Sequence, residues 1–319
     1  MVPINRQQKQ PKMIFLAGPT GCGKTALSLL LAEGLQGEIV SADSMQIYIG
    51  MDIGTAKATL IERTHIRHHL IDICEVSNPF SVVEFYSAAQ DAINDIQSRG
   101  KIPIIVGGCG FYMHALLYGP PTGPPSVPEV RARLESEMEH RGPDILFRRL
   151  RDLDPDYAAT ITVNDRHKII RALEIMTLTS QPVSSFSWKA RGPQLSGPYR
   201  AWFIHRPRPT LYKRVEERCD HMIEEGLIAE TEALLKKGLR TNPTAAQAIG
   251  YRQAIEYLDS PQTDADYATF VADFKKASRR YIKRQFTWFR REPLFRWLDI
   301  EVHDMEVLVD MMIQDCRLL

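Results

Sequence analysis

Short apolar runs separated by helical segments make up the first part of the chain. The runs at 13–17, 38–42, 69–73 and 102–106 have the length of buried strands, and residues 81–99 show helical periodicity that ends at Gly100. Strands that alternate with helices form a doubly wound parallel sheet. We therefore expect an α/β fold whose site lies at the carboxyl ends of its strands.

The pattern changes after Tyr118. A Gly- and Pro-rich connection at 119–125 precedes residues 127–180, where charged and apolar positions alternate at helical spacing. The apolar run 202–205 predicts a strand that returns to the sheet, and the chain after Pro209 is again helical with breaks at Gly226, Gly238 and Gly250. The expected organisation is a flexible tail at 1–12, a catalytic core of 13–118 and 199–319, and a helical insertion domain at 119–198.

Composition excludes several classes of protein. The net charge is +1, so bulk charge favours no particular partner. The cysteines are scattered without a C-x-x-C pair, which suits a reducing cytosol and argues against a structural metal site. No apolar run approaches the roughly 20 residues of a membrane span. We expect a cytoplasmic protein with no membrane partner.

One glycine-rich stretch connects the first strand to the first helix. It has the spacing of a P-loop, in which the glycines bring backbone N–H groups close to phosphate oxygens. Within it Lys24 supplies a positive charge and Thr25 offers a hydroxyl to Mg²⁺. The alternative is a glycine turn that binds nothing. The sequence thus predicts a P-loop NTPase-like parallel sheet with a helical insertion and a helical C-terminal region, and a diphosphate or nucleotide site at Gly18, Pro19, Thr20, Gly21, Cys22, Gly23, Lys24 and Thr25.

The acid that nucleotide hydrolysis requires is missing from its expected place. The strand 102–106 ends in Gly107-Gly108, where most P-loop enzymes carry a magnesium-binding carboxylate. Asp43 follows the second strand, and its carboxylate is predicted to lie over the cleft as a magnesium ligand or general base; the alternative is a turn or helix-capping residue. Asp72 is interpreted instead as a structural partner of His68 or His69.

Two groups of basic residues come late in the chain. Arg214 and Arg218 stand four apart on a predicted helix, so both can hold a diphosphate; surface ion pairs with Glu217 or Asp220 are the alternative. Residues 275–291 mix basic and aromatic side chains, with Arg280 and Arg284 on one helical stripe. That segment predicts a phosphate-backbone surface, and a merely solvated basic face is the alternative.

These motifs together resemble the tRNA dimethylallyltransferase family over nearly the whole chain. The P-loop by itself is shared by many families, whereas the pair formed by residues 41–48 and 50–57 is highly specific. The matching motifs are Gly18–Thr25, Ser41–Tyr48, Gly50–Lys57, Val106–Tyr112, Asn164–Arg166, Arg171–Glu174, Gly250–Gln253 and Lys283–Trp288.

The resemblance implies a prenyl transfer. Dimethylallyl diphosphate would place its pyrophosphate on the P-loop, and N6 of adenosine 37 in tRNAs that read codons starting with U would be the nucleophile. Asp43 matches the family's general base and Arg214 its pyrophosphate-binding arginine, with Lys24, Thr25 and Mg²⁺ stabilising the leaving group. Implied partners are the tRNA anticodon stem-loop and dimethylallyl diphosphate, with a monomer as the expected state. ATP can also occupy such a loop. A P-loop small-molecule kinase and a non-catalytic RNA-binding nucleotide switch remain the rivals.

The family's tRNA contacts fall on several short segments. Cys109 stands where Thr is common, Lys168 where Arg is usual, and Gln247 where many members carry a basic residue, so these three contacts depart from the pattern. The implied tRNA-binding residues are Asp43, Ser44, Met45, Gln46, Cys109, Arg131, His167, Lys168, Ile169, Ile170, Arg171, Gln247, Ala248, Ile249, Gly250, Tyr251, Arg252, Arg280, Lys283, Arg284, Gln285 and Thr287.

Overall fold

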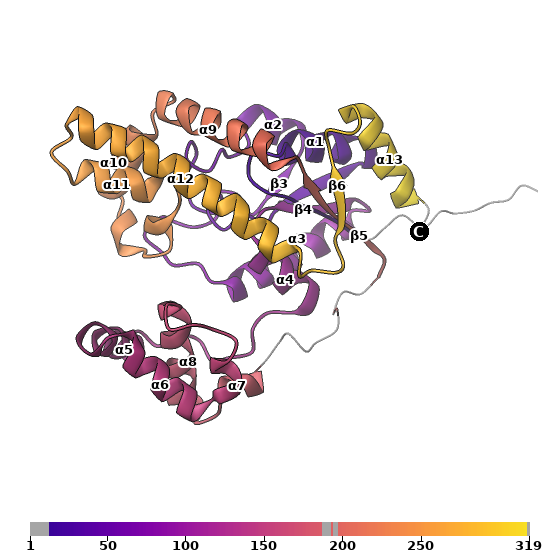
Figure 1. Cartoon of the computed structure of the whole chain (residues 1–319). Helices are drawn as coiled ribbons and strands as arrows, with labels where there is room; N and C mark the ends of the chain where they lie inside the picture. Colours follow the sequence, from indigo (N-terminus) through magenta and orange to yellow (C-terminus); the bar gives the residue numbers. More distant parts are fainter. Residues whose placement is uncertain (1–12, 187–192, 194–196, 318–319) are drawn as a thin grey trace, which may run out of the picture. The chain divides into compact units, whose positions relative to one another are not determined.

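A parallel sheet with helices on both faces carries the catalytic core (Figure 1). The computed structural model describes residues 13–186, 193 and 197–317, so the tail expected at 1–12 lies outside the described residues. The strand order is β3-β2-β4-β1-β5-β6, and each recorded pairing is parallel. The strands are β1 (Met13–Ala17), β2 (Gly37–Ser41), β3 (His68–His69), β4 (Ile102–Gly107), β5 (Tyr199–His205) and β6 (Arg296–Asp299). The predicted α/β parallel sheet is confirmed.

The crossover from β1 to β2 runs in one direction across the sheet and the crossover from β3 to β4 runs in the other. Right-handed crossovers therefore place α1 and α3 on opposite faces. The core helices are α1 (Lys24–Leu35), α2 (Leu60–His65), α3 (Val82–Ser98), α4 (Gly110–Tyr118), α9 (Arg208–Glu224), α10 (Leu227–Lys236), α11 (Tyr251–Leu258), α12 (Asp264–Phe289) and α13 (Met305–Arg317).

Local sequence sets where helices α3 and α12 begin. Ser81 and Glu84 form a capping box at the start of α3, and Thr263 and Asp266 form another at the start of α12. Helix α12 buries Phe270, Phe274 and Phe286 along one stripe. The basic residues of its C-terminal half lie on other stripes, so one helix serves both the core and the surface.

Contacts divide the chain into two compact units, Met1–Leu116 with Leu195–Leu319 and Leu117–Gln194. The second unit is helical and has its own apolar core, in which Leu134, Leu150 and Ile169 are buried. Its helices are α5 (Pro128–Arg141), α6 (Pro143–Leu153), α7 (Pro155–Ala158) and α8 (Arg166–Thr179), followed by the 3-10 turn η1 (Val183–Phe186).

The strand predicted at 69–73 is wrong beyond its first residue. Leu70 and Asp72 have φ angles of 62° and 56°, in the left-handed region that a strand cannot use. The Asp72 carboxylate accepts hydrogen bonds from Lys57 and Arg63, so the predicted pairing with His68 or His69 is also wrong. His69 bonds Glu38 instead. Strand β6, at the edge beside β5, was not predicted.

Glu38 is a buried carboxylate at the start of β2. Arg99, Lys101 and His69 all bond its side chain, the Arg99 Nη2 at 2.7 Å. The Arg99 guanidinium, followed by Lys101 and His69, holds the pKa of Glu38 far below its usual 4.5, against the opposing effect of burial. This cluster ties β2 to the end of α3 and the start of β4.

We predict that Glu38→Gln lowers the free energy of unfolding by about 1–3 kcal/mol at neutral pH, because the buried hydrogen bonds lose their charged acceptor. The folded-state pKa is depressed, so the stabilisation is present above pH 4.5 and is lost as the pH falls from there towards the folded value. Urea unfolding between pH 7 and pH 4 measures this. Exposed Glu33→Gln is the matched control, and equal effects of both variants at every pH would contradict the prediction.

Candidate active site

The P-loop follows β1 and is forced into its shape by glycine. A Cβ at Gly18 would lie 2.5 Å from the Ile204 carbonyl oxygen, and Gly23, with φ 106°, precedes the first turn of α1. The close approach leaves no room for a side chain at Gly18, and the positive φ at Gly23 would strain any residue with a Cβ. The loop therefore presents backbone N–H groups and the N-terminus of α1 to the cleft, an arrangement that binds phosphate.

Lys24 folds over this loop. Its Nζ donates to the carbonyls of Gly18 and Pro19 at 3.0 and 2.8 Å. Burial lowers the pKa of Lys24 and nearby Arg218 lowers it further, whereas Cys22 and Asp43 oppose that change. An anion bound to the loop would oppose this lowering of the Lys24 pKa more strongly, since negative charge stabilises the ammonium form. The Thr25 side chain is exposed at the start of α1.

Asp43 lies just beyond β2, where it makes a turn contact and also lines a pocket. Its Oδ1 accepts the Met45 N–H at 2.9 Å, a turn contact. The same residue lines a pocket of about 260 Å³. The turn fixes the carboxylate against the pocket.

The pocket combines a polar end with an apolar wall. Thr20, Asp43 and Arg218 are among its polar lining residues. Other lining residues are Ser44, Met45, Gly54, Thr55, Val215, Cys219, Met222, Thr244, Gln247, Ala248, Ile249, Tyr251, Phe274, Ser278, Tyr281 and Arg284. Burial is the main cause that raises the pKa of Tyr281, so its hydroxyl stays neutral. The arrangement suits a ligand with one anionic end and one hydrocarbon end.

The two arginines predicted to hold the diphosphate, Arg214 and Arg218, lie in different places on α9. Arg214 is exposed, and its Nε donates to the Gly21 carbonyl at 3.0 Å. Arg218 lines the pocket and donates to the Thr55 carbonyl at 3.5 Å. Burial lowers the pKa of Arg218, and the Asp43 carboxylate opposes that shift. The two acids considered as alternative partners of these arginines pair with lysines instead. Glu217 pairs with Lys213, and Asp220 pairs with Lys275.

Gln285 joins the P-loop to the end of β4. Its Oε1 accepts the Thr20 N–H at 3.0 Å and its Nε2 donates to the Gly108 carbonyl at 3.0 Å. Only 4% of the residue is exposed. In this structure the Gln285 amide is an internal brace, and the contact of this residue with tRNA stays a prediction.

Other predicted tRNA-binding residues fall into three groups. Ser44, Met45, Gln46, Cys109 and the segment 247–252 lie in the core unit, and exposed Arg280, Lys283, Arg284 and Thr287 lie on α12. Arg131, His167, Lys168 and Arg171 belong to the helical unit. Ile169, Ile170, Ala248, Gly250 and Tyr251 are buried. Ile169 and Ile170 belong to the apolar core of the helical unit, whereas Ala248 and Tyr251 line the pocket, and their contacts with tRNA stay predictions.

Within the helical unit, predicted cations already have partners. Arg131 pairs with Glu135, Lys168 with Asp165, and Arg171 with the buried Glu174. In the core unit, burial raises the pKa of the Cys109 thiol to about 11. At neutral pH this cysteine is a neutral, weak hydrogen-bonding group in place of the common threonine.

Arg206 and Glu230 were missed by the sequence analysis. Arg206 follows β5 directly, and its Nε donates to the Cys22 carbonyl at 3.1 Å while its Nη1 pairs with Glu301. A basic residue just beyond a predicted strand was the available signal. Glu230 bonds backbone N–H groups of the segment 50–57, and nothing in its own surroundings in the sequence marks it.

The donor set fits a magnesium ion that arrives with its ligand. Among the described residues no three His, Cys, Asp or Glu side chains gather as a metal cage. Mg²⁺ keeps several waters and commonly binds through one or two protein oxygens together with substrate phosphates. The exposed Thr25 hydroxyl beside a phosphate loop meets that requirement. Over the described stretch, no helix is long and apolar enough to cross a membrane.

A P-loop on a parallel sheet, beside a pocket with one carboxylate and an apolar wall, defines a class of α/β enzymes that act on phosphorylated substrates. The IPP transferase family model matches residues 46–292, so the chain belongs to the IPP transferase family. A zeta-toxin model matches only residues 2–51, the stretch with the P-loop.

Curated and solved relatives agree with this assignment. A tRNA dimethylallyltransferase of Protochlamydia amoebophila is 56% identical over 99% of this chain and 92% of its own, and one of Chlamydia pneumoniae is 49% identical over 90% and 84%. The tRNA isopentenylpyrophosphate transferase of Bacillus halodurans has 36% identity and a TM-score of 0.68, covering 96% of this chain and 97% of its own. A eukaryotic dimethylallyltransferase solved acting on tRNA has 28% identity and a TM-score of 0.72, covering 90% of this chain and 73% of its own.

We predict that Gln285→Met, which keeps the length of the side chain but removes both hydrogen bonds, lowers the free energy of unfolding by about 1–3 kcal/mol. The Thr20 N–H and Gly108 carbonyl would lose their shared partner. Urea denaturation gives the value, with Gln314→Met on the exposed face of α13 as the control. Indistinguishable unfolding of the two variants would show that the brace contributes nothing.

Proposed function

We propose that this chain transfers a dimethylallyl group from dimethylallyl diphosphate to N6 of adenosine 37 in tRNAs that read codons starting with U. The products are N6-isopentenyladenosine and pyrophosphate. One observation carries the proposal: the Asp43 carboxylate, Thr20 of the P-loop and Arg218 line a single pocket that continues along an apolar wall. Membership of the IPP transferase family supports the same reaction.

The polar end of the pocket suits the diphosphate. Backbone N–H groups of the P-loop and the N-terminus of α1 favour negative charge, and Lys24 and Arg218 add positive charge beside them. Arg214 lies against the loop at the Gly21 carbonyl, within the same region. Mg²⁺ held through Thr25 would neutralise charge on the departing pyrophosphate.

The apolar wall suits the five-carbon tail and the target base. Val215, Met222, Ile249 and Phe274 supply hydrocarbon and ring surface beside the acid. A dimethylallyl group that leaves its diphosphate carries allylic cation character, which water would trap. Exclusion of water by this wall therefore favours transfer to the amine over hydrolysis.

Asp43 completes the reaction as general base. The N6 lone pair forms the new C–N bond while the C–O bond of dimethylallyl diphosphate breaks and its electrons leave with pyrophosphate. The N6 proton then passes to the Asp43 carboxylate. The Met45 N–H holds the carboxylate by Oδ1, which orients it without neutralising its charge.

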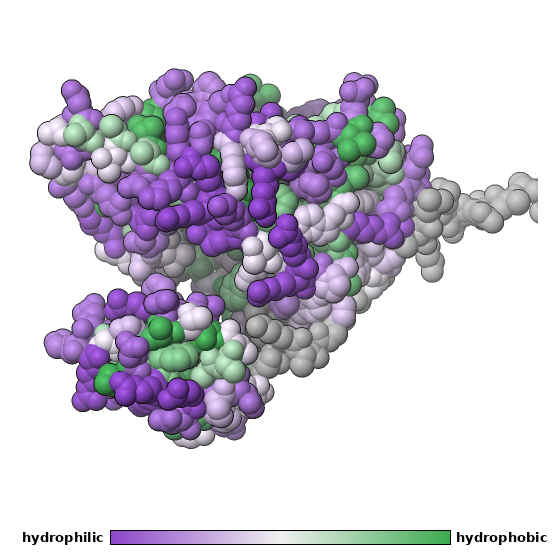
Figure 2. Space-filling model, in the orientation of Figure 1, coloured by the Kyte–Doolittle hydropathy of each residue, from purple (hydrophilic) through white to green (hydrophobic). Residues whose placement is uncertain are grey.

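The C-terminal half of α12 supplies a surface for the tRNA backbone. Arg280, Lys283 and Arg284 are exposed there, and the face formed by α9 and α12 is largely hydrophilic (Figure 2). The Arg284 guanidinium also lies 5.4 Å from the centroid of the Tyr281 ring. Because Arg284 and Tyr281 both line the pocket, a backbone held here lies beside the reacting base.

A monomer in the cytoplasm is the form we propose. Residues of one chain suffice to line the pocket, and the five cysteines are free thiols, as in a reducing compartment. A small-molecule kinase is less favoured because β4 ends in Gly107-Gly108 rather than in a magnesium-binding acid.

Asp43→Asn should lower the transfer rate by roughly two to four decades, since a positioned base is worth that much. The amide keeps the shape and the Oδ1 acceptor, so tRNA affinity should fall far less than the rate. Single-turnover transfer and filter binding give the two quantities. Near-normal turnover of the variant would remove Asp43 from the mechanism.

Arg280→Ala and Arg284→Ala should weaken tRNA binding and flatten its dependence on salt by about one unit of log–log slope per lost phosphate contact. Affinity for dimethylallyl diphosphate should stay within a few fold for Arg280→Ala. Arg240→Ala, at a surface arginine that pairs with Asp259, is the matched control. Unchanged slopes in both α12 variants would mean that this face is merely solvated.

A further inference from the structure

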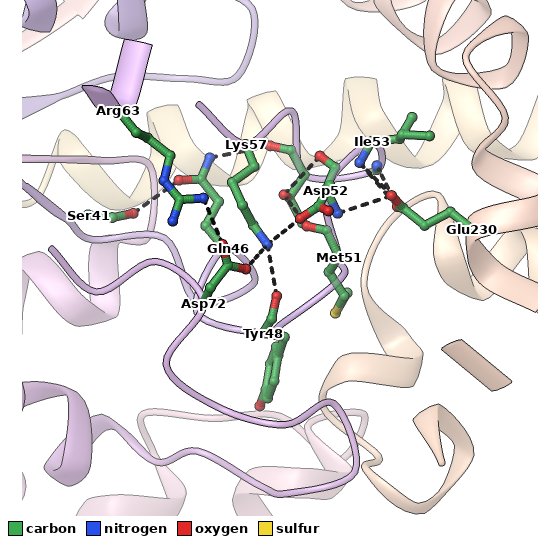
Figure 3. Close-up of polar contacts among 12 residues, drawn as sticks. Ser41, Gln46, Tyr48, Met51, Asp52, Ile53, Lys57, Arg63, Asp72 and Glu230 are labelled. Atoms are coloured by element: carbon green, nitrogen blue, oxygen red, sulfur yellow. Dashed lines mark hydrogen bonds and ion pairs between the residues drawn. The ribbon is translucent and has the colours of Figure 1, made fainter. Parts of the chain in front are cut away.

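The segment 50–57 forms part of the pocket, yet the proposed chemistry assigns it no role. Gly54 and Thr55 line the pocket. The segment is a loop between β2 and α2, which normally implies mobility. Two charged side chains hold it instead, one from helix α10 and one at the end of the segment itself (Figure 3).

Glu230, on α10, is the first of these two. Its carboxylate accepts the backbone N–H groups of Asp52, Ile53 and Gly54 at 3.2, 2.9 and 3.3 Å. The Tyr251 hydroxyl donates to the same carboxylate at 2.6 Å. Four donors on one carboxylate fix both the loop and the acid, because charge-assisted hydrogen bonds of this kind are strong.

Lys57 holds the other end of the loop. Its Nζ bonds the Tyr48 carbonyl at 2.9 Å and the carboxylates of Asp52 and Asp72 at 2.6 Å each. Only 3% of the lysine side chain is exposed. Figure 3 shows Glu230 and Lys57 on opposite sides of Asp52, so the loop is held from two directions.

Gly54 lies where no larger residue fits. A Cβ there would lie 2.5 Å from the Tyr251 ring. Tyr251 therefore supports the loop by its ring and holds Glu230 by its hydroxyl. The neighbouring Ala56 has φ 44°, a left-handed conformation that costs energy in a residue with a Cβ and persists only where the surroundings enforce it.

Thr55 connects the fixed loop to Arg218 in the pocket. Its backbone carbonyl accepts Nε2 of Gln46 at 3.4 Å and Nη2 of Arg218 at 3.5 Å. Its hydroxyl donates to the Met51 carbonyl at 2.7 Å, which closes the loop on itself. The place of one carbonyl thus helps to set the direction of Arg218, the arginine that lines the pocket with Asp43.

We propose that Glu230 is a positioning residue for prenyl transfer: it fixes the loop 51–57 so that the Thr55 carbonyl directs Arg218 towards the diphosphate. This inference rests on the proposed function. It assigns to Glu230, which lies outside the pocket lining, an effect on the use of dimethylallyl diphosphate. Loss of the carboxylate frees three backbone N–H groups and lets the Thr55 carbonyl move.

The test is a double-mutant cycle in the full-length chain. Transfer is measured at saturating tRNA with varied dimethylallyl diphosphate for the wild type, Glu230→Ala, Arg218→Ala and the double variant. Glu232→Ala, on the same helix at an exposed residue that pairs with Lys236, is the matched control. Circular dichroism and active-site titration correct the rates for the folded, active fraction.

Glu230→Ala should lower kcat/KM for dimethylallyl diphosphate by roughly 10- to 100-fold, as expected when a charged group is misplaced by about 1 Å. Glu230→Gln, which keeps one accepting oxygen, should recover part of the loss. In the Arg218→Ala background, adding Glu230→Ala should lower kcat/KM by less than about threefold. Both changes act through the same arginine side chain, so their effects should not add.

Two results would overturn the inference. One is an effect of Glu230→Ala no larger than that of Glu232→Ala; the other is the full effect of Glu230→Ala persisting in the Arg218→Ala background. If Glu230→Ala does not fold, Tyr251→Phe removes a single donor to the carboxylate and runs through the same cycle with the same criteria. A wild-type chain that transfers no dimethylallyl group would instead refute the proposed function, so the two failures are distinguishable.

Discussion

Parallel pairing of β1, β4 and β2 is the constraint on which the site depends. Ala17 pairs with Gly107 and Ser41 with Val106, so the three strands end at one edge of the sheet. The P-loop, Asp43 and the Gly107-Gly108 turn therefore converge without any contact between distant side chains. The edge is also tight, since a Cβ at Gly107 would lie 2.2 Å from the Ala42 carbonyl oxygen. A glycine in place of the usual acid is thus a steric requirement as well as a sign of different chemistry.

Helices α9 and α12 pack against each other and add side chains to the site formed at the ends of the strands. Arg218 of α9 reaches the pocket, and Gln285 of α12 joins Thr20 to Gly108. Helix α12 also carries exposed cations beside the pocket, so the element that braces the phosphate loop is the one we propose for tRNA. Glu230 of α10 adds a third element, which acts on the pocket through the loop at 51–57. The proposed catalytic groups are few, but their positions depend on α9, α10 and α12, which come late in the chain.

Features that a local sequence pattern marks could be predicted from the sequence. Contacts between residues far apart in the chain could not. The P-loop and the place of Asp43 follow from strand, turn and helix signals within a few residues. The strand expected at 69–73 failed because ion pairs of Asp72 override apolar alternation. Gln285 was expected to contact tRNA only because the family resemblance implied it, and its bracing role could not be seen because its partners lie 177 and 265 residues away in the chain. No sequence pattern near Glu230 marks it, because its carboxylate accepts hydrogen bonds from backbone N–H groups of a distant loop.

Transfer of label from dimethylallyl diphosphate to tRNA is the direct test of the proposed reaction. The purified chain is incubated with dimethylallyl diphosphate labelled in its hydrocarbon part, Mg²⁺ and unmodified tRNA, and the nucleosides are separated after digestion. We expect label in N6-isopentenyladenosine at position 37, with one pyrophosphate released for each group transferred. A parallel reaction with labelled ATP should release phosphate at no catalytic rate. Unlabelled tRNA together with rapid tRNA-stimulated phosphate release from ATP would show that this chain is a nucleotide switch and not a prenyltransferase.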